Sequence, residues 1–103
     1  MEPLDLGHGH TLRFTHWAPE RDLNPQYDGI PDIDPVGAII DHPKADGTTC
    51  SGSVLFDSPA VAQLFKGSPR WTVECLQPLT LSPSVACSCG DHGFVKDGKW
   101  VPA

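Results

Sequence analysis

The chain has 103 residues, of which 39% are hydrophobic, so it is long enough for one small globular domain and too apolar for an intrinsically disordered chain. With 10 glycines and 11 prolines, we expect much of its length to lie in loops. The formal net charge of -6, without any block of lysines or arginines, disfavours nucleic-acid binding. No apolar run is long enough to cross a membrane, and the N-terminus lacks a signal-peptide pattern, so we expect a protein that is neither membrane-bound nor exported.

The N-terminal third predicts one strand between two irregular segments. Residues 1–10 are polar and rich in glycine and histidine, which is typical of an N-terminal arm. Apolar and polar side chains alternate over residues 11–16, as in a half-buried strand. Residues 18–35 carry repeated prolines and aspartates, so we expect a long loop there that is mobile or lies against a partner.

The middle of the chain predicts a hairpin and then one short helix. Residues 36–41 and 54–56 are apolar strand candidates, and a turn at Asp46 and Gly47 separates them. The helix is predicted over residues 59–66, because Ser58 can cap its first turn and a proline suits its first position.

The C-terminal part predicts another strand and a second hairpin. Residues 71–76 alternate in the period-two manner of a strand. Residues 94–96 and 99–101 flank Asp97 and Gly98, a pair that readily adopts the positive φ angles of a type I′ turn. The fold class predicted for this single domain, residues 1–103, is mainly β (α+β), a small loop-rich β-sheet module with one short helix and a C-terminal hairpin.

A candidate metal site lies in the C-terminal part, residues 70–103. Cys87, Cys89 and His92 place two thiols and an imidazole within six residues, and a glycine between them allows a tight turn. Structural zinc sites take four such sulfur and nitrogen ligands. Cys75 is the nearest candidate for the fourth ligand, so the predicted zinc ligands are Cys75, Cys87, Cys89 and His92.

Other interpretations of the same residues stay open. Cys50 or His16 could replace Cys75 as the fourth ligand, although Cys50 lies among turn residues that suggest a surface or half-buried thiol. Cys75 could instead be a buried thiol, because a reduced cysteine often packs as a small apolar side chain. His8 and His10 suggest a metal-binding tract, but two histidines on an arm are usually only solvated.

The sequence contains none of the common catalytic motifs. It has no Gly-x-Ser-x-Gly elbow, no His-Glu-x-x-His pair and no glycine-rich phosphate loop. If the zinc were catalytic, three ligands, an open position and a nearby acid or base would be needed, and Glu74 or Asp91 could serve as that group.

The C-terminal third resembles a family of small uncharacterised proteins, predicted to bind metal, from phages and from ubiquitin-like operons of some bacteria. The similarity lies in the segment from Pro78 to Val85, in the Cys/His cluster, and in the segment from Gly93 to Trp100. In the N-terminal half the family usually has further cysteines in a knuckle, where the segment from His16 to Pro19 of this chain offers only one histidine. The resemblance implies a small β-rich module with a zinc ion and a phage origin, and it implies no established activity.

The function that we expect is therefore a non-catalytic, zinc-stapled interaction module, in which a bound zinc ion cross-links the fold. The context is a phage accessory or virion-associated (capsid or head) protein, in the cytoplasm of the host cell or in the virion. Its partners would be virion proteins or further copies of the chain, with no nucleic acid and no membrane. The alternative is a small zinc-dependent hydrolase or peptidase-like enzyme, and the acidic charge leaves an inhibitor of a nucleic-acid enzyme as a third option.

Overall fold

The computed structural model of the protein describes residues 2–87 and 89–103. Within this part of the chain the protein is mainly β, as predicted, with 51% of the residues in strands that form three sheets. The same residues contain one short α-helix, which also agrees with the prediction.

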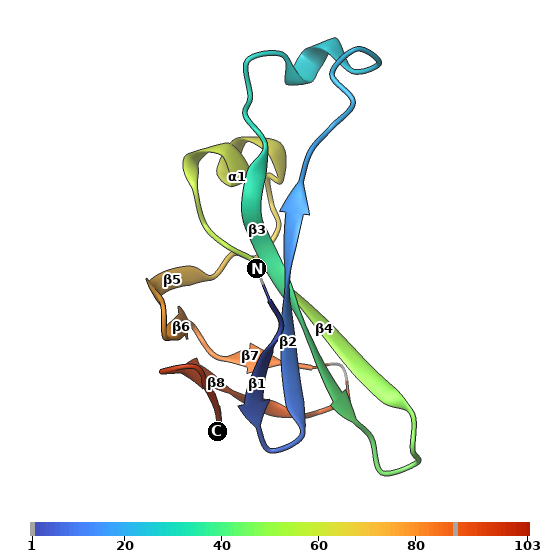
Figure 1. The fold of residues 1–103 in the computed structure, drawn as a ribbon, viewed down its shortest axis with the longest axis vertical. Coiled ribbons are helices and arrows are strands. Elements are labelled where there is room, and N and C mark those ends of the chain that lie inside the picture. Colours follow the sequence, from blue (N-terminus) through green and yellow to red (C-terminus); the bar gives the residue numbers. More distant parts are fainter. Residues whose placement is uncertain (1, 88) are drawn as a thin grey trace.

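The largest sheet is antiparallel and has the strand order β1-β2-β3-β4 (Figure 1). Its strands are β1 (Leu4–Gly7), β2 (His10–Trp17), β3 (Ile33–Pro43) and β4 (Thr49–Leu55). β2 and β3 extend along most of the molecule, and the β1-β2 and β3-β4 turns lie at the same end of the sheet (Figure 1).

The segment predicted as an N-terminal arm differs in the structure, because it contains β1. Gly7, His8 and Gly9 have φ angles of 80°, 52° and 75°, so they form a tight turn that folds β1 back onto β2. Glycine adopts positive φ angles without a steric penalty. A sequence that looks flexible therefore forms the turn between two paired strands.

One face of this sheet carries apolar side chains over most of its length. At the end near the β3-β4 turn, the same face carries side chains that can bind a metal. Across β3 and β4, Ala38 is paired with Val54, and two residues further along each strand are Ile40 and Gly52. Because side chains alternate between the faces of a strand, the next pair on the same face is His42 and Cys50. His42 and Cys50 are both buried, at 9% and 6% exposure.

The long loop lies at the opposite end of the sheet from this pair (Figure 1). It connects β2 to β3 and holds one turn of 3-10 helix, η1 (Pro25–Tyr27). The predicted loop ended at residue 35, whereas β3 already begins at Ile33. The Arg21 side chain donates hydrogen bonds to the carbonyl oxygen of Ile30 and, at 2.8 Å, to the carboxylate of Asp32.

The short helix α1 (Pro59–Leu64) follows β4 and begins as the sequence predicts. The Ser58 hydroxyl accepts a hydrogen bond of 3.2 Å from the Val61 amide, and the proline occupies the first turn. Val61 is fully buried, so the helix packs through this side chain.

Two smaller sheets complete the fold. Their strands are β5 (Thr72–Leu76) and β6 (Leu79–Ser82) in one, and β7 (Val85–Ala86), β8 (His92–Lys96) and β9 (Lys99–Pro102) in the other. Asp97 and Gly98 have φ angles of 52° and 74°, which confirms the predicted turn of the C-terminal hairpin.

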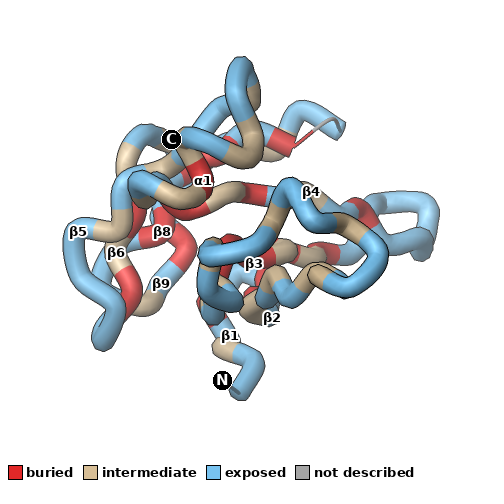
Figure 2. Tube along the Cα trace, turned by 90° about the horizontal axis from the view of Figure 1, so that it is seen from above, coloured by how far each residue is buried: buried red, intermediate tan, exposed pale blue. Residues whose placement is uncertain are grey.

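The core lies between the four-stranded sheet and these two smaller sheets (Figure 2). The fully buried members include Leu6, Leu12 and Ile40 from the large sheet and Leu79 and Val95 from the smaller ones. The core is thus built from segments that are distant in sequence, and the buried His10 and His42 extend it towards the end of the sheet.

Candidate metal centre

The β3-β4 hairpin places a nitrogen donor and a sulfur donor side by side. His42 and Cys50 occupy directly opposite positions in the two strands. Directly opposite residues of an antiparallel pair have Cβ atoms about 4.5–5.5 Å apart and project from the same face. The register of this hairpin is therefore the local reason why these two side chains meet.

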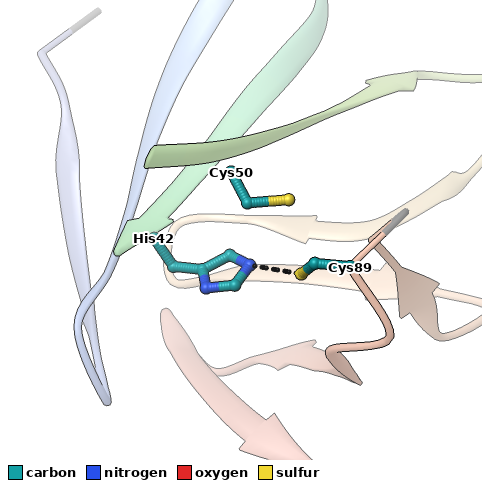
Figure 3. A group of neighbouring side chains, drawn as sticks. All are labelled: His42, Cys50 and Cys89. Carbon is teal, nitrogen blue, oxygen red and sulfur yellow. Dashed lines mark hydrogen bonds between the residues drawn. The ribbon is translucent and has the colours of Figure 1, made fainter. Parts of the chain in front are cut away.

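The third donor comes from the turn between β7 and β8. The Cys87 amide donates to the carbonyl oxygen of Asp91 at 2.7 Å, and the Gly90 amide donates to the carbonyl oxygen of Cys87 at 3.0 Å. Gly90 has a φ angle of 95°, which favours glycine. This turn brings the Cys89 sulfur to 3.3 Å from Nε2 of His42 (Figure 3).

His42, Cys50 and Cys89 therefore form one cluster, which we call the thiol cluster. The ligand atoms of these three residues all lie within 4.8 Å of one another. In Figure 3 the two sulfur atoms and the imidazole point into the same space, although they come from β3, β4 and the β7-β8 turn. Two thiols and an imidazole in such proximity can hold a metal ion.

A fourth sulfur lies beside the thiol cluster. Cys87 is 6% exposed, and its side chain forms a hydrogen bond with Cys50. Burial and, to a smaller extent, the neighbouring Cys50, Cys89 and Asp91 together raise the pKa of the Cys87 thiol to about 11. The Cys87 sulfur would lie 3.2 Å from a Cβ atom at Gly52, so the absence of a side chain at that position makes room for it.

A second group of potential ligands shares His42 with the thiol cluster. Oδ2 of Asp91 lies 2.5 Å from Nε2 of His10 and 3.7 Å from Nε2 of His42, and the ligand atoms of the three residues all lie within 4.8 Å. Nδ1 of His10 donates to the carbonyl oxygen of His8 at 2.8 Å, because a carbonyl can only accept.

Three stacked rings support this end of the molecule. The His10 ring lies between those of His42 and Trp100, with centroid distances of 4.8 Å and 4.2 Å and interplanar angles of 19° and 11°. Trp100 is buried in β9, so the stack connects β3, β2 and the C-terminal sheet. Packing and electrostatics therefore both hold the imidazole rings in place.

The thiol cluster opens to solvent through a shallow hollow with a volume of about 460 Å³. It is lined by His42, Cys89 and Asp91, by Pro43 at the end of β3, and by residues 44–46 of the β3-β4 turn. Cys89 is exposed, whereas Cys50 and Cys87 are buried. A solvent molecule or small solute can therefore reach the Cys89 sulfur.

Of the four predicted ligands, two lie at the thiol cluster and two lie away from it. Cys89 belongs to the thiol cluster and Cys87 lies beside it. Cys75 is exposed on β5, and Nε2 of the exposed His92 lies 2.7 Å from the Ser84 hydroxyl. Within residues 2–87 and 89–103, neither Cys75 nor His92 belongs to a group of potential metal ligands.

Cys50, the less favoured alternative to Cys75, belongs to the thiol cluster, while His16, the other alternative, is exposed on β2. The physical reason is the register of β3 and β4, which directs Cys50 towards the core face. His42 was missing from the sequence prediction altogether. The signal that could have found it is alternation, because Ala38, Ile40 and His42 follow one another at every second position of one strand.

Comparison with known proteins yields no similar family, curated protein or solved structure. No helix in the described part of the chain is both long and apolar enough to cross a membrane.

Proposed function

We propose that the protein is a non-catalytic binding module whose fold is cross-linked by one zinc ion. The ligands are His42, Cys50 and Cys89, with Cys87 as the fourth. The observation that carries this proposal is the thiol cluster, in which three donors from sequence-distant segments lie within 4.8 Å of one another. Zinc is the metal of choice because thiolate and imidazole donors in a set of four match its tetrahedral structural sites.

The position of the thiol cluster supports a structural role. A bound ion would connect the β3-β4 hairpin to the β7-β8 turn, and these segments lie on opposite sides of the core. The apolar core of a chain of 103 residues is small, so a metal cross-link adds stability that the core alone supplies only in part. The free energy of metal binding would then contribute directly to folding.

The partner class that we propose is protein, either virion proteins or further copies of this chain, in a phage accessory protein of the host cytoplasm or the virion. The sequence resemblance of the C-terminal third supports the phage context. Among the residues that the structure describes, four large apolar side chains are exposed and available for contact with a protein: Leu23, Leu76, Phe94 and Val101.

The test is a metal analysis of protein purified without an affinity tag. We expect one zinc ion per chain in the wild-type protein, and loss of that zinc in Cys50→Ser and Cys89→Ser. Cys75→Ser is the matched control, because it removes an exposed thiol outside the cluster and should retain full zinc content. Wild-type protein without bound zinc, or equal zinc content in Cys50→Ser and wild type, would refute the proposal.

The second candidate function is a small zinc-dependent hydrolase, and the group of His10, His42 and Asp91 favours it. Two imidazoles and one carboxylate leave a coordination position open for water, and the hollow of about 460 Å³ borders two of these residues. X-ray absorption spectroscopy of the zinc-loaded protein separates the two. A sulfur-rich coordination shell supports the structural site, and a shell of nitrogen and oxygen alone supports the hydrolase.

A further inference from the structure

We propose that the thiol cluster is a peroxide-sensitive switch, in which oxidation joins Cys89 to Cys50 by a disulfide bond and releases the zinc ion. This inference rests on the proposed zinc site and concerns its regulation. It follows from two features of the clustered cysteines, namely their exposure and the proximity of their sulfur atoms. The position of Cys75 outside the cluster provides a control.

The first feature is a difference in exposure among the three sulfurs. Cys89 is exposed and lines the hollow beside the β3-β4 turn, so hydrogen peroxide can reach its sulfur from solvent. Cys50 and Cys87 are buried at 6% exposure each. Because oxidation of a thiolate depends on access as well as on charge, Cys89 is the first site of attack.

The second feature is that a resolving thiol lies nearby. The sulfurs of Cys89 and Cys50 lie within 4.8 Å of each other, and a disulfide bond requires about 2.05 Å. The sulfurs therefore need to approach by roughly 3 Å at most. Cys89 lies in a turn outside the strands, where the backbone generally adapts more readily than in a paired strand.

The chemical step balances with hydrogen peroxide as the oxidant. The Cys89 thiolate attacks one peroxide oxygen, the O–O bond breaks, and the sulfur becomes a sulfenic acid while hydroxide leaves. The Cys50 thiolate then attacks the Cys89 sulfur, so that an S–S bond forms and the S–O bond breaks with loss of a second hydroxide. Two thiolates have lost two electrons in total, and the two hydroxides take up protons to give two molecules of water.

The disulfide removes two of the four zinc ligands. A disulfide sulfur carries no charge and is a poor zinc ligand in comparison with a thiolate. His42 and Cys87 alone would hold the ion weakly, so oxidation releases it. Zinc itself keeps its oxidation state throughout this process.

Cys75 offers an internal control for this inference. It is exposed on β5 like Cys89, but it lies outside the thiol cluster. Peroxide can therefore oxidise the Cys75 thiol without affecting the metal. A Cys75→Ser variant removes this side reaction and leaves the three clustered cysteines in place.

The experiment treats zinc-loaded Cys75→Ser protein with hydrogen peroxide, measures released zinc with a chromogenic chelator, and maps the product by tryptic digestion without reduction. Cleavage after lysine and arginine places Cys50 in the peptide 45–66, and Cys87 and Cys89 in the peptide 71–96. A disulfide between Cys50 and Cys89 joins these two peptides, whereas one between Cys87 and Cys89 stays within the second. Fragmentation of the joined peptides identifies which cysteine is linked to Cys50.

We expect zinc release to rise in proportion to the amount of joined peptide, with Cys89 as the linked residue, and a reductant to restore zinc binding. Retention of zinc after peroxide treatment, or release with Cys87 as the disulfide partner of Cys89 or Cys50, would overturn the inference while leaving the zinc site intact. Failure of the zinc site itself would look different, because the untreated protein would then contain no zinc.

Discussion

The two ends of the four-stranded sheet are held together by different kinds of contact. At the end with the thiol cluster, side chains 47 and 81 residues apart lie together, namely His42 with Cys89 and His10 with Asp91. At the other end, the Arg21 side chain binds residues only 9 and 11 positions further along the chain.

The difference indicates that the two ends of the sheet contribute unequally to the stability of this small domain. The same two strands, β2 and β3, run into both ends, but within residues 2–87 and 89–103 the side-chain hydrogen bonds that span 47 and 81 residues both lie at the end with the thiol cluster. The loop between residues 18 and 32 depends on local hydrogen bonds, so it can open without loss of the core.

Removal of zinc should have the largest effect. A chelator is expected to lower the stability of the zinc-loaded protein by several kcal/mol, on the order of 15 °C in Tm, because metal binding adds to the free energy of unfolding. Hydrogen exchange should accelerate in β3, β4 and the β7-β8 turn, and remain unchanged in residues 18–32. Uniform acceleration throughout the chain would contradict the contrast between the two ends.

Substitution of Gly93 should have the next largest effect. A Cβ atom there would lie 2.6 Å from Trp100 and 2.7 Å from the carbonyl oxygen of Val101, so Gly93→Ala is expected to cost about 1–3 kcal/mol in thermal or urea unfolding. Gly29→Ala is the matched control at the loop end. Nothing lies within 4 Å of its Cβ position, and the cost should be limited to the strain of its positive φ angle, about 1 kcal/mol.

The Cys87 thiol gives the metal-free protein a dependence on alkaline pH. Its pKa is about 11 in the folded protein against an ordinary value of 9.0, so the unfolded chain loses this proton first as the pH rises. The contribution of Cys87 to stability is therefore complete below pH 9.0 and declines through the interval up to about pH 11. Urea unfolding of metal-free wild type and Cys87→Ser across this interval should show a smaller decline in the variant.

The smallest effect is expected for Arg21→Ala. The ion pair with Asp32 is partly exposed, so its loss should change global stability by less than about 1 kcal/mol. Limited proteolysis within residues 18–32 should nevertheless become faster, because the side chain that closes the loop is gone. A variant that unfolds globally before it is cleaved in the loop would show that the loop is part of the cooperative core.

Local signals in the sequence predicted the local parts of the fold. The Ser58 cap and the turn at Asp97 and Gly98 depend on a few adjacent residues, and both were identified correctly. Strand β1 was missed because glycine and histidine in a short polar segment resemble an unstructured arm. Three positive φ angles in succession instead make a turn there, which composition alone does not reveal.

The candidate metal site was predictable only in part for the same reason. Cys87 and Cys89 were predicted as ligands because they are close together in the sequence. His42 and Cys50 meet through the pairing of β3 with β4, and they approach Cys89 only because the C-terminal sheets cover the same face. Register and sheet packing are tertiary properties, so proximity in sequence favoured Cys75 and His92 over the residues that the fold brings together.

The wide spacing of the clustered residues also sets an order of events during protein synthesis. Pairing within the β1-β4 sheet needs the chain only as far as Leu55, whereas Cys89 leaves the ribosome later. In a nascent chain, the imidazole of His42 and the thiol of Cys50 would thus already lie side by side in the hairpin before Cys89 is synthesised. Metal binding by all three residues would then have to wait for synthesis of the β7-β8 turn, and products that end before Cys89 would lack this cross-link.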